Sequence, residues 1–178
     1  GTERLGAEIV YEGTTSIERR ARAEELAESE NLTIVPPFDH RHIIAGQGTV
    51  GLEIARDWPD VDLVLAPIGG GGLASGIAAA VKRILPNTRV IGVEPVGAAC
   101  MCKALDEGHP ALLEEIDTIA DGLAPVMAGE LTFEHARDLM DDVVTVEDDA
   151  IKSATEFLVS RHKLIVEYSG AATTAALL

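Results

Sequence analysis

The uncharged stretch of residues 63–81 constrains the fold of this chain more than any other feature. It begins with the apolar run 63–67, continues through four consecutive glycines at 69–72, and ends within a helix-forming segment at 73–85. Pro67 and the glycines would interrupt a membrane-spanning helix in its middle, although the stretch is almost long enough to be one. The pattern instead predicts a buried strand, a tight turn and a helix in a soluble protein.

Strand-like and helix-like segments alternate along the rest of the chain. Further strands are expected at 7–11, 32–35, 89–93 and 143–146. Helices are expected from Thr15 to near Ser29 behind a Thr15–Glu18 capping box, from just after Gly46–Thr49 to near Trp58, and over 98–107, 132–140 and 148–163. Strands that alternate with helices of this length require crossover connections. The sequence therefore predicts an α/β fold with a mainly parallel sheet flanked by helices.

Both ends of the sequence look interrupted. Residues 2–6 resemble the last turn of a helix with its terminal glycine, and residues 171–178 start a helix that reaches no cap. We expect the chain to be part of a longer protein, with two frayed termini as the alternative.

Composition and charge exclude several classes of partner. The chain is 47% hydrophobic and carries a formal charge of −16, which is typical of a globular protein that repels nucleic acid and anionic membranes. Its two cysteines are too few for a disulfide framework, and no signal peptide is evident at the N-terminus. We expect a cytoplasmic protein that binds neither nucleic acid nor membrane.

The glycine run indicates an anion site. It follows the carboxyl end of a strand, where parallel sheets bind ligands, and glycine allows backbone N–H groups to crowd around an anion. No Lys or Arg lies between Arg56 and Lys82, so a phosphate here would be held by backbone amides and the helix N-terminus. A tight turn without a ligand is the alternative.

The identity of that phosphate is open on motif grounds. Gly69-x-Gly71-x-x-Ala74, with Glu94 after the next strand, satisfies a dinucleotide pattern and would suit an NAD(P)-dependent oxidoreductase. Two strand-like segments precede the glycines, however, whereas a dinucleotide fold usually carries its fingerprint on the first strand. The Walker pattern fails, because no Gly-Lys-Ser/Thr follows the glycines.

Several motifs in order resemble a known family. They are Pro37-Phe-Asp39, Ile44-Ala-Gly-Gln-Gly-Thr-Val-Gly-Leu-Glu53, Pro67-Ile-Gly-Gly-Gly-Gly-Leu73, Gly92-Val-Glu-Pro95, Thr118-Ile-Ala-Asp-Gly122, and Glu167 before Ser169-Gly170. The chain resembles threonine dehydratases and serine racemases, which are pyridoxal-phosphate enzymes of fold type II, the tryptophan-synthase-β-like class. The resemblance implies an ammonia-lyase that deaminates a small amino acid, threonine or serine, to a 2-oxo acid, and commonly a homo-oligomer.

The resemblance also implies the cofactor-binding residues. Gly69, Gly70, Gly71, Gly72 and the amide of Leu73 would bind the cofactor phosphate; Gly122 would lie against the pyridine ring, and Glu167 near its nitrogen edge. Residues 1–30 would be a remnant of the smaller N-terminal domain, and residues 31–178 the phosphate-binding large domain, truncated at its C-terminus.

A divalent-cation site seen in some family members is matched in part. Glu94 and the carbonyl of Ala98 occupy two of its positions, but Cys100 occupies the third. Thiolates are poor ligands for Mg²⁺ and Ca²⁺, which counts against a cation. Glu94 is equally well interpreted as a solvated acid at the end of a strand.

The family's Schiff-base lysine, in a Ser-x-Lys segment, has no counterpart among Lys82, Lys103, Lys152 and Lys163. The chain thus contains no catalytic residue and should be inactive alone. A non-catalytic, degenerate subunit is the remaining alternative.

Two other features are given structural interpretations. The sequence Asp39-His40-Arg41-His42 is interpreted as a polar loop, and Thr49 as a helix cap.

Overall fold

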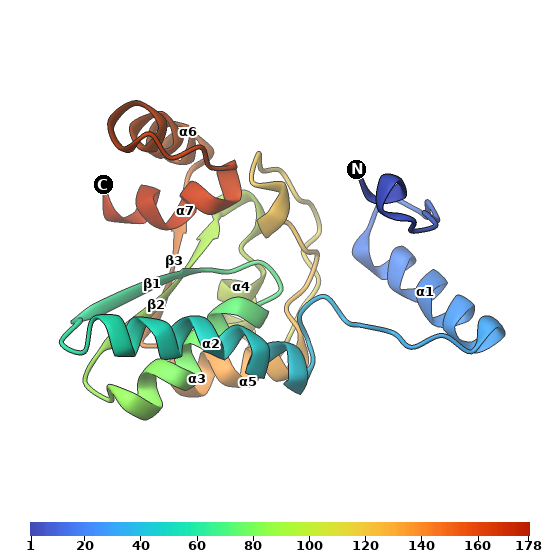
Figure 1. The fold of residues 1–178 in the computed structure, drawn as a ribbon, viewed down its shortest axis with the longest axis horizontal. Coiled ribbons are helices and arrows are strands. Elements are labelled where there is room, and N and C mark those ends of the chain that lie inside the picture. Colours follow the sequence, from blue (N-terminus) through green and yellow to red (C-terminus); the bar gives the residue numbers. More distant parts are fainter. The chain divides into compact units, whose positions relative to one another are not determined.

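The computed structural model describes all 178 residues and separates them into two compact units, Gly1–Val35 and Pro36–Leu178 (Figure 1). Whether these units correspond to the two expected domains stays a prediction. No helix combines the length and the apolar character needed to cross a membrane.

Unit 1 is built around one helix, α1 (Ser16–Glu30), preceded by the short 3₁₀ turn η1 (Thr2–Leu5). The predicted capping box is confirmed, because the Thr15 hydroxyl accepts the amide of Glu18 while the Glu18 carboxylate accepts the amide of Thr15. The expected strands at 7–11 and 32–35 are wrong. Neither segment pairs with another strand, and without a neighbour an extended segment forms no sheet hydrogen bonds.

Unit 2 has the predicted α/β architecture. Its elements are α2 (Arg41–Asp57), β1 (Leu63–Pro67), α3 (Gly72–Ile84), β2 (Arg89–Pro95), α4 (Cys100–Glu107), α5 (Glu130–Leu139), β3 (Asp142–Val146), α6 (Asp148–Phe157) and α7 (Tyr168–Leu177), with short turns η2 (Val96–Ala98), η3 (Asp121–Leu123) and η4 (Leu158–His162). The expected helix over 148–163 therefore ends at Phe157 and continues only as the π-helical turn η4.

The three strands form one parallel sheet in the order β1-β2-β3, with Leu63 opposite Arg89 and Val93 opposite Val144. Helices cover both faces (Figure 1). Alternate residues of the buried strands belong to two separate hydrophobic clusters: Val90 packs with α3, α4 and α5, whereas Val93 packs with α6 and α7. The period-two alternation of a strand thus divides the core between the two faces.

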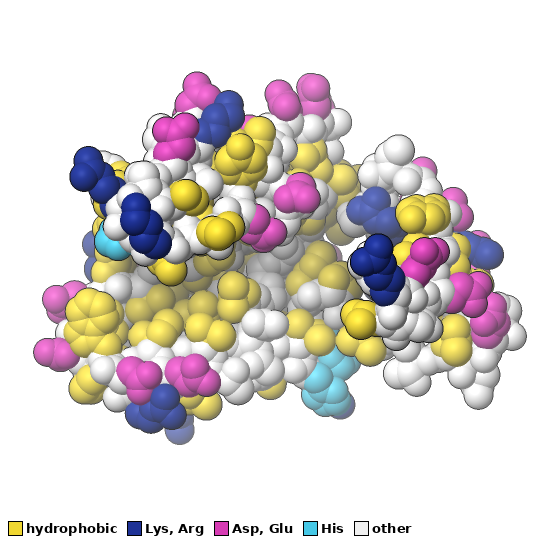
Figure 2. Space-filling view, turned by 45° about the horizontal axis from the view of Figure 1, so that its top comes forward, with side chains coloured by type: hydrophobic (Ala, Val, Ile, Leu, Met, Phe, Trp, Pro, Cys, Tyr) yellow, Lys and Arg dark blue, Asp and Glu magenta, His cyan; other side chains and the backbone are white.

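β1 is an edge strand, because it pairs only with β2. Figure 2 shows hydrophobic side chains gathered in a hollow of unit 2 between the α6–α7 pair and α2. Leu63 on β1 remains 39% exposed. This side of the sheet is less completely covered than the side packed by α3.

Helix α2 begins at Arg41, so the expectation that it starts after Gly46–Thr49 is wrong. The glycines lie inside the helix because they allow it to approach α3 closely. A Cβ added at Gly76 on α3 would lie 2.5 Å from the Gly48 nitrogen and 2.5 Å from the Ile44 carbonyl oxygen. The role of Thr49 as a cap is also wrong, since its hydroxyl donates to the Gly46 carbonyl within the helix at 2.8 Å.

The close packing of α2 on α3 generates a stability prediction. Gly76→Ala should lower the free energy of unfolding by about 1–3 kcal/mol, because the added methyl group forces the two helix backbones apart. Gly46→Ala is the matched control on the same helix pair, since nothing lies within 4 Å of its added Cβ. It should raise the free energy of unfolding by about 0.5–1 kcal/mol through helix propensity. Urea unfolding measures both; equal effects would contradict the packing role.

Candidate functional site

The glycine loop, residues 69–72, joins the carboxyl end of β1 to the start of α3. The amide of Ile68 is the last to pair with the sheet, donating to the Val93 carbonyl at 2.8 Å. Gly71 is the N-cap of α3 and has a φ of +93°, a left-handed conformation that favours glycine. The predicted order of strand, glycine turn and helix is confirmed.

The amides of residues 69–74 are the chemically distinctive groups of this loop. None of them donates a hydrogen bond to a backbone or side-chain acceptor of the chain, and the first amide that does is Ser75, which donates to the Gly71 carbonyl at 2.9 Å. A run of unpaired amides at a helix N-terminus is a ready anion-binding group. Each bond to an anion would contribute about 1.5–3 kcal/mol.

The glycines are also required by their surroundings. A Cβ at Gly70 would collide with the ring of Phe38, and one at Gly71 would lie 2.8 Å from the Thr132 Cβ. Gly71 and Gly72 are buried, whereas Gly69 and Gly70 are partly exposed. Close packing behind the loop therefore explains part of the glycine content. The unpaired amides of residues 69–71 add to those that the N-terminus of any helix leaves free.

Gly122 and Glu167, the two predicted residues distant in sequence, lie at the same edge of the sheet. A Cβ at Gly69 would lie 3.1 Å from the Gly122 carbonyl oxygen, and one at Gly122 would lie 3.5 Å from Glu167 Oε1. The amide of Gly122 donates to Ser169 Oγ at 2.9 Å. The fold thus brings the glycine loop, Gly122 and Glu167 together, and adds Ser169 as a contact that the sequence did not predict.

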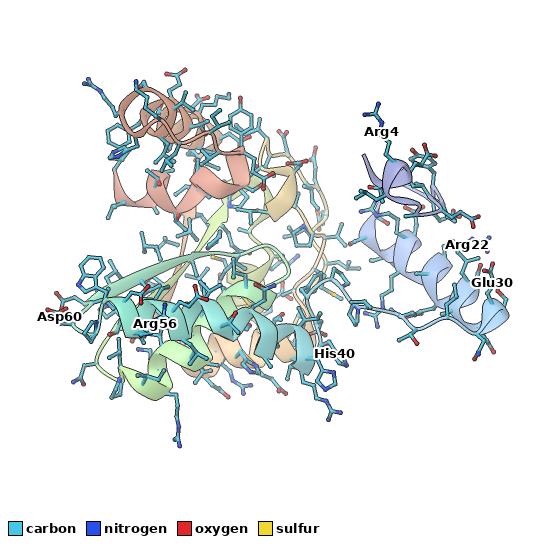
Figure 3. All side chains as sticks on the ribbon, viewed as in Figure 1. Arg4, Arg22, Glu30, His40, Arg56 and Asp60 are labelled. Carbon is cyan, nitrogen blue, oxygen red and sulfur yellow. The ribbon has the colours of Figure 1, made fainter.

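Thr132 and Asp39 are two further residues at the loop that sequence reasoning missed. The buried Thr132 hydroxyl donates to the Gly70 carbonyl at 2.7 Å. Asp39 caps α5 by accepting the amides of Glu130, Leu131 and Thr132 at 3.0–3.2 Å. Asp39 therefore belongs to the fold of the loop rather than to an open polar segment. His40 caps α2 and points outward (Figure 3). Its ring centroid lies 4.9 Å from that of the exposed His42.

Glu94 is completely buried, so its interpretation as a solvated acid is wrong. Its carboxylate accepts the amides of Met101 and Cys102, both at 2.8 Å, at the start of α4. Burial raises the pKa of Glu94 above its ordinary value of 4.5, although these two hydrogen bonds oppose the shift. Glu94 anchors α4 to β2.

The structure gives no support to a cation at Glu94 and Ala98. Ala98 is fully buried, and nowhere in the 178 residues do three acidic, histidine or cysteine side chains form a group suited to a metal. Burial raises the pKa of Cys102 to about 12 and raises that of Cys100 as well, with the Glu94 charge adding to both shifts. Both thiols are therefore protonated at neutral pH and are poor metal ligands.

The lysines are engaged elsewhere. The Lys82 ammonium pairs with Asp141 at 2.6 Å and donates to the Thr88 carbonyl at 2.9 Å, which directs it to the start of β2. Lys103, Lys152 and Lys163 donate to the Leu112 carbonyl, the Asp149 carboxylate and the Ser160 carbonyl. Each of the four ammonium groups thus has a partner outside the glycine loop.

A groove of about 450 Å³ lies between α2, α3 and α5, away from the glycine loop. Its lining is mainly small and aliphatic, with Ile44, Leu52 and Ala80 among the members. A ligand site needs convergent polar groups as well as volume. The loop amides therefore identify the functional site better than the groove does.

Comparison with known proteins decides the family. The model of the family described as "Pyridoxal-phosphate dependent enzyme" matches residues 1–178. The chain belongs to this family. The threonine dehydratase of Nicotiana attenuata is 44% identical over 171 residues, covering 96% of the chain and 28% of the relative. The biosynthetic L-threonine dehydratase IlvA of Escherichia coli is 40% identical over 173 residues, covering 97% of the chain and 34% of the relative.

Two solved structures share the fold. The processed form of threonine deaminase isoform 2 from Solanum lycopersicum superposes with a TM-score of 0.91 at 44% identity, covering 97% of the chain and 50% of that protein. Maize serine racemase superposes with a TM-score of 0.92 at 36% identity, covering 98% of the chain and 53% of that protein. The resemblance stated from the motifs and the predicted fold class are both confirmed.

The dinucleotide alternative loses its support. It required Glu94 to reach a ribose hydroxyl, but Glu94 is fully buried and bonded to the backbone of α4. The family match also indicates pyridoxal phosphate rather than a nicotinamide cofactor.

The raised pKa of Glu94 generates a prediction for stability against pH. The unfolded chain releases this proton near pH 4.5, whereas the folded chain holds it to higher pH. Wild-type stability should therefore fall, relative to that of Glu94→Gln, as pH rises above 4.5. Chemical unfolding at about pH 5.5 and pH 8 should show a larger loss from Glu94→Gln at the lower pH.

The control is Glu134→Gln, on the exposed side of α5. Its effect on the free energy of unfolding should be small at both pH values. A pH-independent effect of Glu94→Gln would contradict the assigned direction of the pKa shift.

Proposed function

We propose that the glycine loop binds the phosphate of pyridoxal 5′-phosphate and that the chain is part of an ammonia-lyase acting on threonine or serine. The unpaired amides of residues 69–74 are the observation that carries the proposal. The nearest basic residues in sequence are Arg56 and Lys82, so hydrogen bonds and the helix dipole would hold the phosphate.

The residues at this edge of the sheet fit the cofactor. Gly69, Gly70, Gly71, Gly72 and Leu73 would hold its phosphate through their amides. The lack of a side chain at Gly122 leaves room for a flat ring, and the exposed Glu167 follows at the N-cap of α7. The serine that packs against Gly122, Ser169, keeps this glycine in place by accepting its amide.

The reaction class rests on the relatives. Bound pyridoxal phosphate would serve as an electron sink for charge at the substrate α-carbon, which permits loss of the β-hydroxyl and then of ammonia. The chain spans 28% and 34% of the two threonine dehydratases compared above, so the activity concerns the whole protein of which it would be a part. The proposed site includes no cation, because the Glu94 carboxylate already accepts two amides of α4.

Compartment and assembly complete the proposal. Two free cysteines, one buried and one partly buried, suit a reducing compartment such as the cytoplasm. A small amino acid as substrate and a homo-oligomer as the working state are proposed from the resemblance alone.

The phosphate site is tested by Gly71→Ala. The added methyl group meets Thr132 and Met101 and strains a φ of +93°, which should turn the neighbouring amides away from the ligand. Calorimetric affinity for pyridoxamine 5′-phosphate, which has no aldehyde to react with surface lysines, should fall about tenfold or more.

Gly108→Ala is the matched control for this test. It introduces the same left-handed strain at a φ of +78°, but in open space at the end of α4. The affinity of Gly108→Ala for pyridoxamine 5′-phosphate should equal that of wild type. Equal losses in both variants, or tighter binding of NAD than of pyridoxamine 5′-phosphate, would contradict the proposal.

The lack of a suitable lysine predicts that the chain alone does not turn over substrate. With pyridoxal phosphate and either L-threonine or L-serine, no 2-oxo acid should form, because all four ammonium groups are bonded elsewhere. The E. coli relative serves as positive control. Turnover by the chain would show that one of its own lysines can do the chemistry.

A further inference from the structure

The carbonyl groups of the glycine loop are all bonded on the protein side. The Gly70 carbonyl accepts the Thr132 hydroxyl at 2.7 Å, and the Gly71 carbonyl accepts the amide of Ser75 at 2.9 Å. The Gly69 carbonyl accepts a longer bond from the Cys100 thiol, with 3.6 Å between sulfur and oxygen. The Gly69 and Gly70 carbonyls thus point toward α4 and α5, and the Gly71 carbonyl points along α3.

This arrangement fixes where the intervening amides point. In a trans peptide the C=O and the following N–H lie in one plane and point in opposite directions. The Gly70 carbonyl, which accepts the Thr132 hydroxyl, shares its peptide plane with the amide of Gly71. This hydrogen bond therefore directs the Gly71 N–H away from Thr132. The same argument applies to Gly70 and Gly72, whose amides are likewise unpaired.

Thr132 is itself held rigidly. It has no exposed surface, its hydroxyl accepts the amide of Gly129 at 3.1 Å, and its own amide is one of three that Asp39 accepts. Its carbonyl accepts the Ser75 hydroxyl at 3.4 Å. Asp39 thereby connects the segment before α2 to the start of α5 and to the glycine loop.

We propose that Thr132 is a positioning residue for phosphate binding: its hydroxyl orients the Gly70–Gly71 peptide, and Asp39 orients Thr132. The inference rests on the proposed function, since the bound group is the phosphate assigned there. Thr132 does not contact the ligand and acts only through the loop backbone.

The experiment compares Thr132→Val, which keeps the shape and removes the hydroxyl, with Thr132→Ser, which keeps the hydroxyl. Thr88→Val is the matched control, because Thr88 is also buried and its hydroxyl donates to the Val61 carbonyl at the same 2.7 Å, far from the loop. Calorimetry measures affinity for pyridoxamine 5′-phosphate, and thermal unfolding measures stability.

We expect Thr132→Val to weaken ligand affinity by about tenfold, and Thr132→Ser by less than about threefold. Thr88→Val should lower the melting temperature and leave affinity unchanged. If Thr132→Val binds as tightly as wild type, or if Thr132→Ser loses as much affinity as Thr132→Val, the inference is overturned while the proposed function stands.

Two further measurements keep the outcomes distinct. If Thr132→Val fails to fold, Asp39→Asn replaces it, because this variant removes one of the two carboxylate oxygens that cap α5. Asp39→Asn should weaken affinity for pyridoxamine 5′-phosphate several-fold. Unchanged affinity would overturn the inference. In wild type, pyridoxamine without phosphate should bind at least about tenfold more weakly than its phosphate. Equal binding would overturn the proposed function and, with it, the role of Thr132.

Discussion

The orientation of three peptide planes in the glycine loop is the constraint on which the candidate site depends. Their carbonyls are taken up by Thr132, Ser75 and Cys100, so their amides are left unpaired on the opposite side. Glycine permits this at Gly71, where φ is +93° and a methyl group would collide with Thr132. The packing role and the proposed binding role of the glycines are therefore linked, because the contacts that exclude side chains behind the loop also orient its peptide planes.

The sheet places this loop beside its partners. Parallel β1 and β2 end at the same edge, so the residues that follow them meet there. β2 ends with Glu94, whose buried carboxylate starts α4 by accepting two amides. α4 in turn supplies the Cys100 thiol that reaches the Gly69 carbonyl. An acid that resembles a cation ligand in sequence is thus part of the support of the loop, and its burial explains both its raised pKa and its unsuitability for a ribose or a metal.

The features that the sequence predicted correctly depend on residues that are close together along the chain. β1, the glycine turn and α3 follow from one apolar run and its breaker, and the Thr15–Glu18 capping box closes within four residues. The residues that it missed act over long separations: Asp39 caps a helix 91 to 93 positions away, and Thr132 reaches Gly70 across 62. The start of α2 was misplaced for the same reason, because the glycines that looked like a helix boundary are explained only by α3. Gly122 and Glu167 came from the family motifs and could not have come from periodicity.

Holding a phosphate and performing chemistry on an amino acid require different groups. A cup of backbone amides has no side chain to titrate and selects its ligand by the number and direction of its hydrogen bonds. Proton transfer and covalent attachment need a tuned lysine, and the four lysines here are bonded to carbonyls or carboxylates away from the loop. The proposed affinity for the phosphate therefore requires none of these lysines. The hydrogen bonds from Thr132 and Asp39 that orient the loop lie within residues 36–178.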